Sequence, residues 1–312
     1  MTVQMGSFRQ GISKNIYRPL RNVASRGFWR NRDWNLVHSL PERDLTADTK
    51  HGRLTFSSKD KFIGWSLYTA GYYGYDDLFT AVDILKSQGK LRDTNPGYLI
   101  DIGANIGTVC IPLVRERVFK KALAFEPEPR NFAYLTGNIE QNGLSDEVLP
   151  FQIALSATNG EVEFELCPEN RGDHRVRLTA PSSDFNYFHE QDRTVMKVPA
   201  RTLDEMLRSL QIEAEEIKLL WMDVQGHEGH VLKGGQSVIA SGVPVVFEFW
   251  PYGLLSMGLD LKWFVDFIAA EFTQLWELRS DKLEAKPASY IRDLCQILQN
   301  GDEVSQTDLL VF

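Results

Sequence analysis

A short glycine-containing segment combines residue types that could bind a charged or hydroxylated ligand. Asp101 ends an apolar run that begins at Tyr98, and Gly103, Asn105 and Gly107 follow it. Glycine allows a tight turn and a close approach of the backbone to a ligand, and the start of a helix offers free N–H groups. The pattern therefore predicts a strand, a ligand-binding turn and a helix. An ordinary turn that needs glycine only for its geometry is the alternative.

A second candidate ligand is Glu126, which ends the next apolar run. An acidic residue about 20 positions after such a turn is where a ribose diol binds in nucleoside-binding sheets. A carboxylate suits this task because it accepts hydrogen bonds from both hydroxyls. The alternative is an exposed glutamate ahead of a helix that begins at Pro129. Because the glycine spacing differs from GxGxxG, it argues against a nicotinamide cofactor and in favour of another nucleoside-type cofactor.

A third group of polar residues follows two later apolar runs. Asp223, His227 and Glu228 come after the first of these runs, and Glu248 lies at the end of the second. The carboxyl ends of parallel strands line one ligand crevice, so we expect these side chains to lie together. Asp223 and His227 are the candidates for proton transfer, since histidine titrates near neutral pH. Alternatively, His227 could stabilise the loop, and Glu228 could simply begin a helix.

Short apolar runs alternate with amphipathic segments along most of the chain. We expect strands near residues 98–100, 122–125, 151–155, 219–222, 243–249, 273–278 and 308–312, and helices near 107–117, 129–143, 202–205, 261–270 and 287–299. Strands that alternate with helices are typical of a doubly wound, mostly parallel α/β sheet.

The chain divides at Pro96 into an extension and a main domain. Residues 1–95 should hold a basic arm, a hairpin over 53–63 and a helix that starts near Asp76, whereas residues 96–312 hold the predicted sheet. The polar stretch 169–197 has no clear periodicity, so we expect a lid or binding loop there.

Composition narrows the possible functions. With 43% hydrophobic and 24% charged residues, the 312-residue chain is typical of a globular protein. A net charge of −8 argues against a nucleic-acid partner. Three widely spaced cysteines without metal-ligand spacing favour reduced thiols and a cytoplasmic location. We expect neither a secretory signal nor a transmembrane segment, because no apolar run reaches about 18 residues.

The first 32 residues are strongly basic. They contain seven lysines and arginines and no acidic residue. A solvated arm is one interpretation of this pattern. Peripheral contact with an anionic lipid surface, docking on an acidic partner or docking on the acidic main domain are the others.

Together these motifs resemble the FkbM family of methyltransferases. The resemblance rests on residues 101–107, on Phe125-Glu126-Pro127, on residues 154–156 before a Gly-Glu-Val-Glu-Phe segment, on residues 201–204, and on residues 223–228 with 231–234. It extends over about residues 96–312 and implies a seven-stranded, Rossmann-like methyltransferase sheet with S-adenosylmethionine as methyl donor. The implied acceptor is a hydroxyl group of a small molecule such as a polyketide, of a sugar or of a glycolipid. The family commonly has glutamate where this chain has Gln225.

In such a sheet, each candidate residue has an expected role. The turn Gly103–Gly107, with Asn105, would hold the methionine end of the donor, with Asp101 near its amino group. Glu126 would hold the ribose, Asp223 and His227 would face the acceptor, and no metal would be required. Three alternatives remain: a nicotinamide-dependent oxidoreductase, a methyltransferase of nucleic-acid or protein nitrogen, and a non-catalytic cofactor-binding domain.

Overall fold

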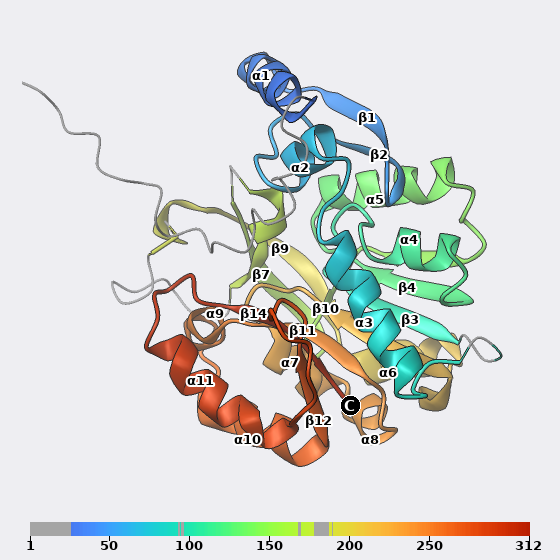
Figure 1. Ribbon diagram of the computed structural model, residues 1–312, viewed down its shortest axis with the longest axis vertical. Helices are drawn as coiled ribbons and strands as arrows, with labels where there is room; N and C mark the ends of the chain where they lie inside the picture. Colours follow the sequence, from blue (N-terminus) through green and yellow to red (C-terminus); the bar gives the residue numbers. More distant parts are fainter. Residues whose placement is uncertain (1–25, 93, 95–96, 168–169, 178–186, 189) are drawn as a thin grey trace, which may run out of the picture.

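A mixed β-sheet forms the centre of the computed structural model, which describes residues 26–92, 94, 97–167, 170–177, 187–188 and 190–312 (Figure 1). The strand order is β13-β12-β14-β11-β10-β3-β4-β5. The strands are β3 Tyr98–Ile102, β4 Lys121–Phe125, β5 Val148–Phe151, β10 Ile217–Met222, β11 Val245–Phe249, β12 Gln274–Glu277, β13 Lys286–Pro287 and β14 Thr307–Val311. Strands β5, β4, β3, β10 and β11 are parallel, and β14 is antiparallel to both of its neighbours. Six of the seven expected strands lie in this sheet near their expected positions, and β13 adds a two-residue edge strand. The strand expected at 151–155 is wrong, because β5 ends at Phe151 and residues 154–155 form β6 of a second sheet.

Helices cover both faces of this sheet because its central strands are apolar on both sides. On β3, for example, Leu99 packs into one hydrophobic core and Ile100 into the other. The first face carries α3 Tyr75–Ser87, α4 Cys110–Arg115 and α5 Pro129–Gln141. The second carries α6 Leu203–Leu210, α7 Glu228–Gly234, α8 Gln236–Ala240, α9 Pro251–Ser256, α10 Leu261–Glu271 and α11 Ile291–Gln299. This two-sided arrangement confirms the doubly wound α/β fold.

Local signals set several helix starts, although some bounds differ from expectation. The side chain of Thr202 caps α6 by accepting a hydrogen bond from the Glu205 N–H, and Glu128 caps α5 in the same way. Helix α4 begins only at Cys110, and the segment expected to be helical from residue 287 holds β13, the 3₁₀ turn η5 Ala288–Tyr290 and then α11. None of the helices in the described part of the chain is long and apolar enough to cross a membrane.

The hairpin of the N-terminal extension differs from the expected one. It pairs β1 Asp44–Thr49 with β2 Gly52–Ser57, and the chain then enters α2 Ile63–Thr69 after a turn. Leu54 and Phe56 therefore lie on the second strand, and the expected return at Phe62 is wrong. The first strand escaped notice because its residues are mostly polar and half-buried or exposed.

The extension packs directly on the main sheet. The Asn138 side chain on α5 pairs with Thr55 of β2, accepting from the backbone N–H at 2.7 Å and donating to the carbonyl at 3.1 Å. Trp34, Leu54 and Phe56 share one hydrophobic core with residues of the sheet. Helix α1, Arg26–Ser39, precedes the hairpin, whereas most of the expected basic arm and residues 95–96 at the expected boundary lie outside the described residues.

A second, smaller sheet lies against the carboxyl ends of the main strands. Its order is β6-β9-β7-β8, with β6 Ala154–Leu155, β7 Gly160–Leu166, β8 Arg175–Arg177 and β9 Thr194–Arg201. The expected irregular stretch 169–197 therefore contains β8, the start of β9 and the turns η2 Arg171–Asp173 and η3 Glu190–Asp192. The hydrophobic pattern of the sequence did not indicate these strands, because buried ion pairs such as that of Arg175 with Glu165 hold them together. Residues 168–169, 178–186 and 189 lie outside the described part.

Candidate active site

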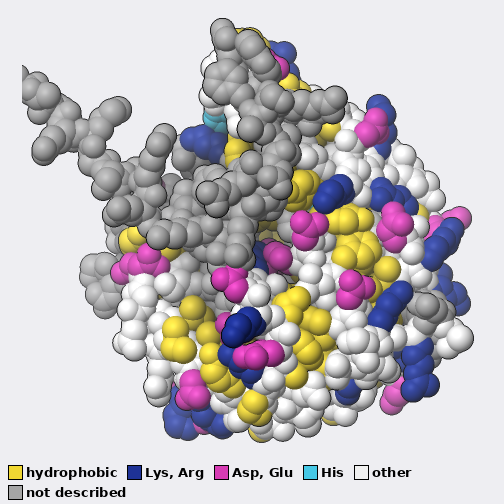
Figure 2. Space-filling view, in the orientation of Figure 1, with side chains coloured by type: hydrophobic (Ala, Val, Ile, Leu, Met, Phe, Trp, Pro, Cys, Tyr) yellow, Lys and Arg dark blue, Asp and Glu magenta, His cyan; other side chains and the backbone are white. Residues whose placement is uncertain are grey.

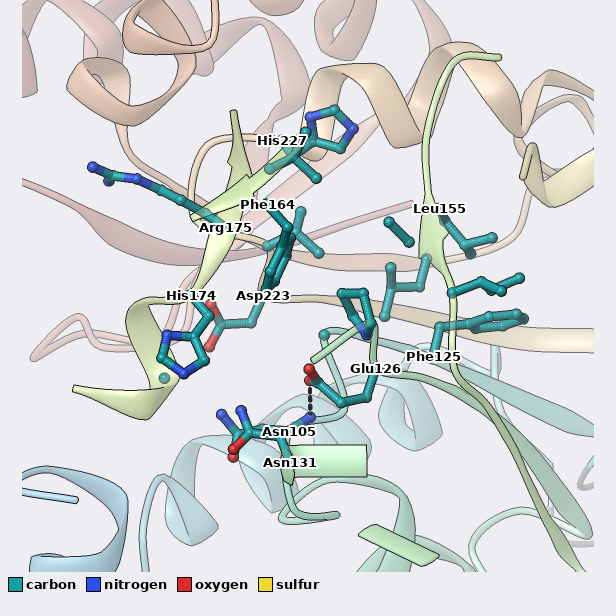
Figure 3. A pocket seen from close by; sticks show the side chains of 18 of the residues that line it. Asn105, Phe125, Glu126, Asn131, Leu155, Phe164, His174, Arg175, Asp223 and His227 are labelled. Carbon is teal, nitrogen blue, oxygen red and sulfur yellow. Dashed lines mark hydrogen bonds between the residues drawn. The ribbon is translucent and has the colours of Figure 1, made fainter. Parts of the chain in front are cut away.

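A pocket lies between the carboxyl ends of β3, β4 and β10 and the smaller sheet (Figure 3). The turn after β3 contributes Gly103 and Asn105, and the end of β4 contributes Glu126. Asp223 follows β10 and also lines the pocket. The opposite wall comes from the smaller sheet and its loops, namely Phe164, Arg171, Gly172, His174, Arg175 and Val176. The fold thus brings together five of the seven residues expected to bind donor or acceptor, namely Gly103, Asn105, Glu126, Asp223 and His227.

The glycine turn holds the ends of two neighbouring strands together. Gly103 has φ +81°, and a Cβ atom there would lie 2.0 Å from the carbonyl oxygen of Asp223. Gly107 does not line the pocket. Its φ is +94°, and a Cβ atom there would lie 2.5 Å from the Ile111 side chain. Packing and backbone conformation are sufficient to require glycine at this position, and the expected contact of Gly107 with the donor remains a prediction.

Asp101 lies beneath the turn and does not line the pocket. Its side chain is buried, and its Oδ2 accepts a hydrogen bond from the Cys110 N–H at 3.0 Å. Burial raises the pKa of Asp101 to about 7. The residue thus holds the start of α4 against β3, and its expected contact with the donor amino group remains a prediction.

Glu126 directs a buried carboxylate into the pocket, where Figure 3 shows it bonded to the turn after β3. Its two oxygens accept hydrogen bonds from the N–H groups of Asn105 at 2.9 Å and Glu128 at 2.8 Å. Burial raises its pKa to about 8, although the two N–H groups oppose this shift. Each carboxylate oxygen retains a lone pair for a further donor, as binding of two ribose hydroxyls requires.

Two buried amide groups beside Glu126 have unused hydrogen-bonding capacity. Asn105 and Asn131 both donate from Nδ2 to the carbonyl of Arg171, each at 3.1 Å. Neither Oδ1 atom has a hydrogen-bond partner among the described residues. Phe125, Ile153 and Leu155 add an apolar wall to the pocket. Hydrogen-bond acceptors next to an apolar wall fit the hydroxyls and the base of a nucleoside, so the residues present suit S-adenosylmethionine.

Asp223, which lines the pocket, is linked to Glu248 outside the pocket lining by one amide. Gln225 donates from Nε2 to Asp223 Oδ1 at 2.6 Å and to Glu248 Oε2 at 3.1 Å. The Asp223 side chain reaches solvent, but the surrounding walls of the cleft desolvate it and raise its pKa to about 6. Burial raises the pKa of Glu248 well above its usual value, and the charges of Asp223 and Asp308 raise it further.

His227 is buried at the back of the pocket. Its Nε2 lies 3.0 Å from Ser156 Oγ, and its ring stacks on His230 with centroids 4.7 Å apart. Burial lowers the pKa of His227 well below the usual value, so the ring remains neutral at physiological pH. A base needs a pKa nearer the working pH. This geometry favours the structural interpretation of His227 over the catalytic one.

His174 is a pocket residue that the sequence did not reveal. Its Nδ1 accepts a hydrogen bond from the Cys167 N–H at 3.0 Å, so the neutral ring carries its proton on Nε2. Burial and the charges of Arg171 and Arg193 lower its pKa to about 3. His174 can therefore offer a ligand one hydrogen-bond donor. Asn131 could have been suspected, because it is a polar residue on the buried face of a helix, whereas His174 lies in a segment without periodicity.

The strand order, the antiparallel β14, and the pocket with an acidic residue after β4 define a Rossmann-like methyltransferase fold. The sequence matches the Methyltransferase FkbM domain over residues 101–282, which is more than half of the chain. The protein therefore belongs to the FkbM family of methyltransferases. Within the part of the chain that the structure describes, no three His, Cys, Asp or Glu side chains converge as metal ligands would.

Two curated relatives and one crystal structure illustrate the similarity. The hexuronic acid methyltransferase AglP of Haloferax volcanii is 32% identical over 152 residues, covering 48% of this chain and 54% of AglP. The 2-O-methyltransferase NoeI of Sinorhizobium fredii is 28% identical over 178 residues, covering 54% of this chain and 70% of NoeI. The match thus spans about half the length of AglP. The methyltransferase FkbM structure from Methylobacillus flagellatus has a TM-score of 0.42 and 14% identity, covering 81% of this chain and 55% of that chain.

Proposed function

We propose that this protein is an S-adenosylmethionine-dependent O-methyltransferase that acts on a hydroxyl group of a sugar or another small molecule. The observation that carries the proposal is one pocket that both Glu126 and Asp223 line. The name of the relative NoeI, a 2-O-methyltransferase, supports oxygen as the methylated atom.

The donor end of the pocket is formed by Glu126 and the residues around it. Glu126 accepts the ribose hydroxyls, Phe125 and Leu155 contact the base, and the turn at Gly103 receives the methionine part. When bound, S-adenosylmethionine supplies a methyl group that its sulfonium already activates. The protein therefore needs mainly to hold the acceptor oxygen in line with that methyl group and to exclude water.

Asp223 is the proposed base at the acceptor end. With a pKa of about 6, it is ionised at neutral pH and can take the proton of the acceptor hydroxyl. Proton removal by a positioned base contributes about 10²–10⁴-fold in rate. His227 is the poorer candidate because its ring is buried and hydrogen-bonded to Ser156. The reaction as proposed requires no metal ion.

Calorimetric titration with S-adenosylhomocysteine tests the donor assignment. We expect binding and a raised Tm, because a ligand of the native state stabilises it by mass action. Binding of a nicotinamide dinucleotide instead would support the oxidoreductase alternative and contradict the proposal. Donor binding without methyl transfer to any of a broad set of hydroxylated acceptors would favour a non-catalytic binding domain.

The distribution of charge on the surface also helps to decide which kind of acceptor the protein binds. Among the described residues on the face in Figure 2, acidic and basic side chains are interspersed. A nucleic-acid partner would require a continuous basic face, so a small or glycan acceptor suits this face better. For the basic residues 1–32 we propose peripheral contact with anionic lipid, which co-sedimentation with phosphatidylserine vesicles at low and high salt would test.

A further inference from the structure

Asp223, which lines the pocket, is linked through Gln225 to Glu248, and Asp308 lies beside Glu248. Glu248 on β11 lies directly opposite Asp308 on β14, so both side chains are on the sheet face that α3 covers. Asp223 follows the neighbouring strand β10. Tyr73 lies just before α3; burial raises the pKa of its hydroxyl, and the charges of Asp223, Glu248 and Asp308 raise it further. The side of the pocket at Asp223 is thus rich in carboxylate hydrogen-bond acceptors.

The arginine nearest to this cluster already has two carboxylate partners. Arg279 Nη2 lies 2.7 Å from Asp308 Oδ2, and Arg279 Nε lies 3.3 Å from Asp77 Oδ2. Its guanidinium is therefore neutralised from two sides. The charges of Asp308, Glu248 and Asp77 also raise its pKa.

The two arginines that line the pocket also pair with carboxylates. Arg171 Nη2 lies 2.8 Å from Glu42, and Arg175 lies 2.8 Å from both Glu165 and Glu190. The Arg175 side chain is fully buried, so these partners are held firmly. An acceptor with a negative charge would have to compete with Glu42 for Arg171 and with Glu165 and Glu190 for Arg175. Glu42 also pairs with Arg130, and Arg175 Nη1 makes no hydrogen bond among the described residues.

Asp223 and Glu248, by contrast, are held by neutral groups. In the described part of the chain, the amides of Gln225 and Gln306 donate to them at 2.6–3.1 Å. Amide donors keep both side chains in place and bring no positive charge that could attract an anionic acceptor. Free lone pairs on these oxygens suit hydroxyl donors, whereas a second anion would meet repulsion in a poorly solvated cleft.

We infer that the acceptor presents an uncharged, hydroxyl-rich group to this cleft, as a neutral sugar ring does, and that sugars with a carboxylate are poor acceptors. The inference deepens the proposed methyl transfer and rests on it. It would separate this protein from AglP, whose name assigns it a hexuronic acid.

Matched acceptors test the inference. The methyl glycosides of glucose, galactose and mannose are compared with those of the corresponding uronic acids, and formation of S-adenosylhomocysteine gives kcat/KM. We expect at least one neutral glycoside to react, and its uronate partner to react about tenfold more slowly or worse. A uronate that matches or exceeds its neutral partner overturns the inference.

If none of the glycosides is methylated, their binding to the protein saturated with S-adenosylhomocysteine tests the inference instead. Saturation-transfer NMR should then detect neutral glycosides and not the uronates, whereas detection of uronates, or of neither group, overturns the inference. Failure of S-adenosylhomocysteine itself to bind would instead contradict the proposed function, so the two failures are distinguishable.

A single substitution tests the role of Arg279. Asp77→Asn removes one of the two charges that neutralise the guanidinium, without touching the pocket. We expect the uronate rate relative to the neutral sugar to rise about threefold or more. Asp76→Asn is the matched control, because Asp76 pairs with Lys50 on the surface and should leave the ratio unchanged. An equal effect of Asp77→Asn on both acceptors would overturn the explanation.

Discussion

Gln225 Nε2 lies 2.6 Å from Asp223 Oδ1, so a neutral amide donates a hydrogen bond to the carboxylate that we propose as the base. The same amide also donates a hydrogen bond to Glu248. A glutamate at position 225 would instead place a third carboxylate beside Asp223 and Glu248. Gln225 has φ +55°, a conformation that costs most residues some energy and aims this side chain across the cleft. The amide thus allows two carboxylates to lie close together.

We expect Gln225→Met to move the pH dependence of methyl transfer. A hydrogen bond to the ionised form lowers a pKa, so its loss should raise that of Asp223 and shift the acidic limb of kcat/KM above pH 6. Gln306→Met is the control, because Gln306 contacts only Glu248 of this pair. An unchanged midpoint in Gln225→Met would show that the amide does not tune the base.

Asp223→Asn should separate catalysis from donor binding. The amide cannot take the acceptor proton, so we expect the rate to fall by about 10²–10⁴-fold while the Kd for S-adenosylhomocysteine changes little. Single-turnover rates and calorimetry measure the two effects. If His227→Asn, and not Asp223→Asn, abolishes transfer in a stably folded protein, the base is His227.

Glu126→Gln should weaken donor binding by about tenfold or more above pH 8, where the Glu126 carboxylate is ionised, since bonds to a charged acceptor contribute about 1.5–3 kcal/mol each. Because Glu126 is buried and accepts two backbone N–H groups, we also expect a lower Tm, in contrast to the small effect expected for an exposed side chain. Glu128→Gln is the control, because Glu128 caps α5 and its loss should affect stability more than donor affinity. Unchanged affinity in Glu126→Gln would place the ribose elsewhere.

Gly107→Ala should destabilise the fold without weakening the donor site. The new methyl group would collide with Ile111, and φ +94° is unfavourable for alanine. Thermal unfolding should show the loss, and calorimetry on the folded protein should give an unchanged Kd for S-adenosylhomocysteine. A stable variant with tenfold weaker binding would restore the interpretation that Gly107 approaches the ligand.

The stability of the protein should depend on His227 below pH 6.5. Burial lowers its folded-state pKa, so the unfolded chain binds a proton that the folded chain does not. Stability is then lost as pH falls from 6.5, by up to about 1.4 kcal/mol per pH unit for this residue. Buried carboxyls with raised pKa values, such as Glu228, act in the opposite direction, so the difference between wild type and His227→Asn is the measurement. Urea unfolding at pH 7.5 and 5.5 should show a smaller loss in the variant, and equal losses would contradict the prediction.

The sequence by itself determined most strands and helices of the main sheet and the positions of Glu126 and Asp223 at its carboxyl edge. Central parallel strands are continuous apolar runs, and a polar residue directly after such a run must lie at the carboxyl edge of the sheet. This information is local, so it is readable without tertiary contacts. The same holds for the starts of α5 and α6, where the capping residue lies three positions before its partner.

Only the tertiary structure decided which of these residues share one pocket. Asn131, Arg171 and His174 reach it from segments far apart in the chain. Burial lowers the pKa of His227, so its ring stays neutral. The contact of Gly103 with Asp223 joins the ends of two strands that lie more than 100 residues apart in the chain. Strand β8 likewise depends on Arg175 finding carboxylates on two other segments. Such properties follow from desolvation and from contacts across the fold, which residue type and local spacing do not encode.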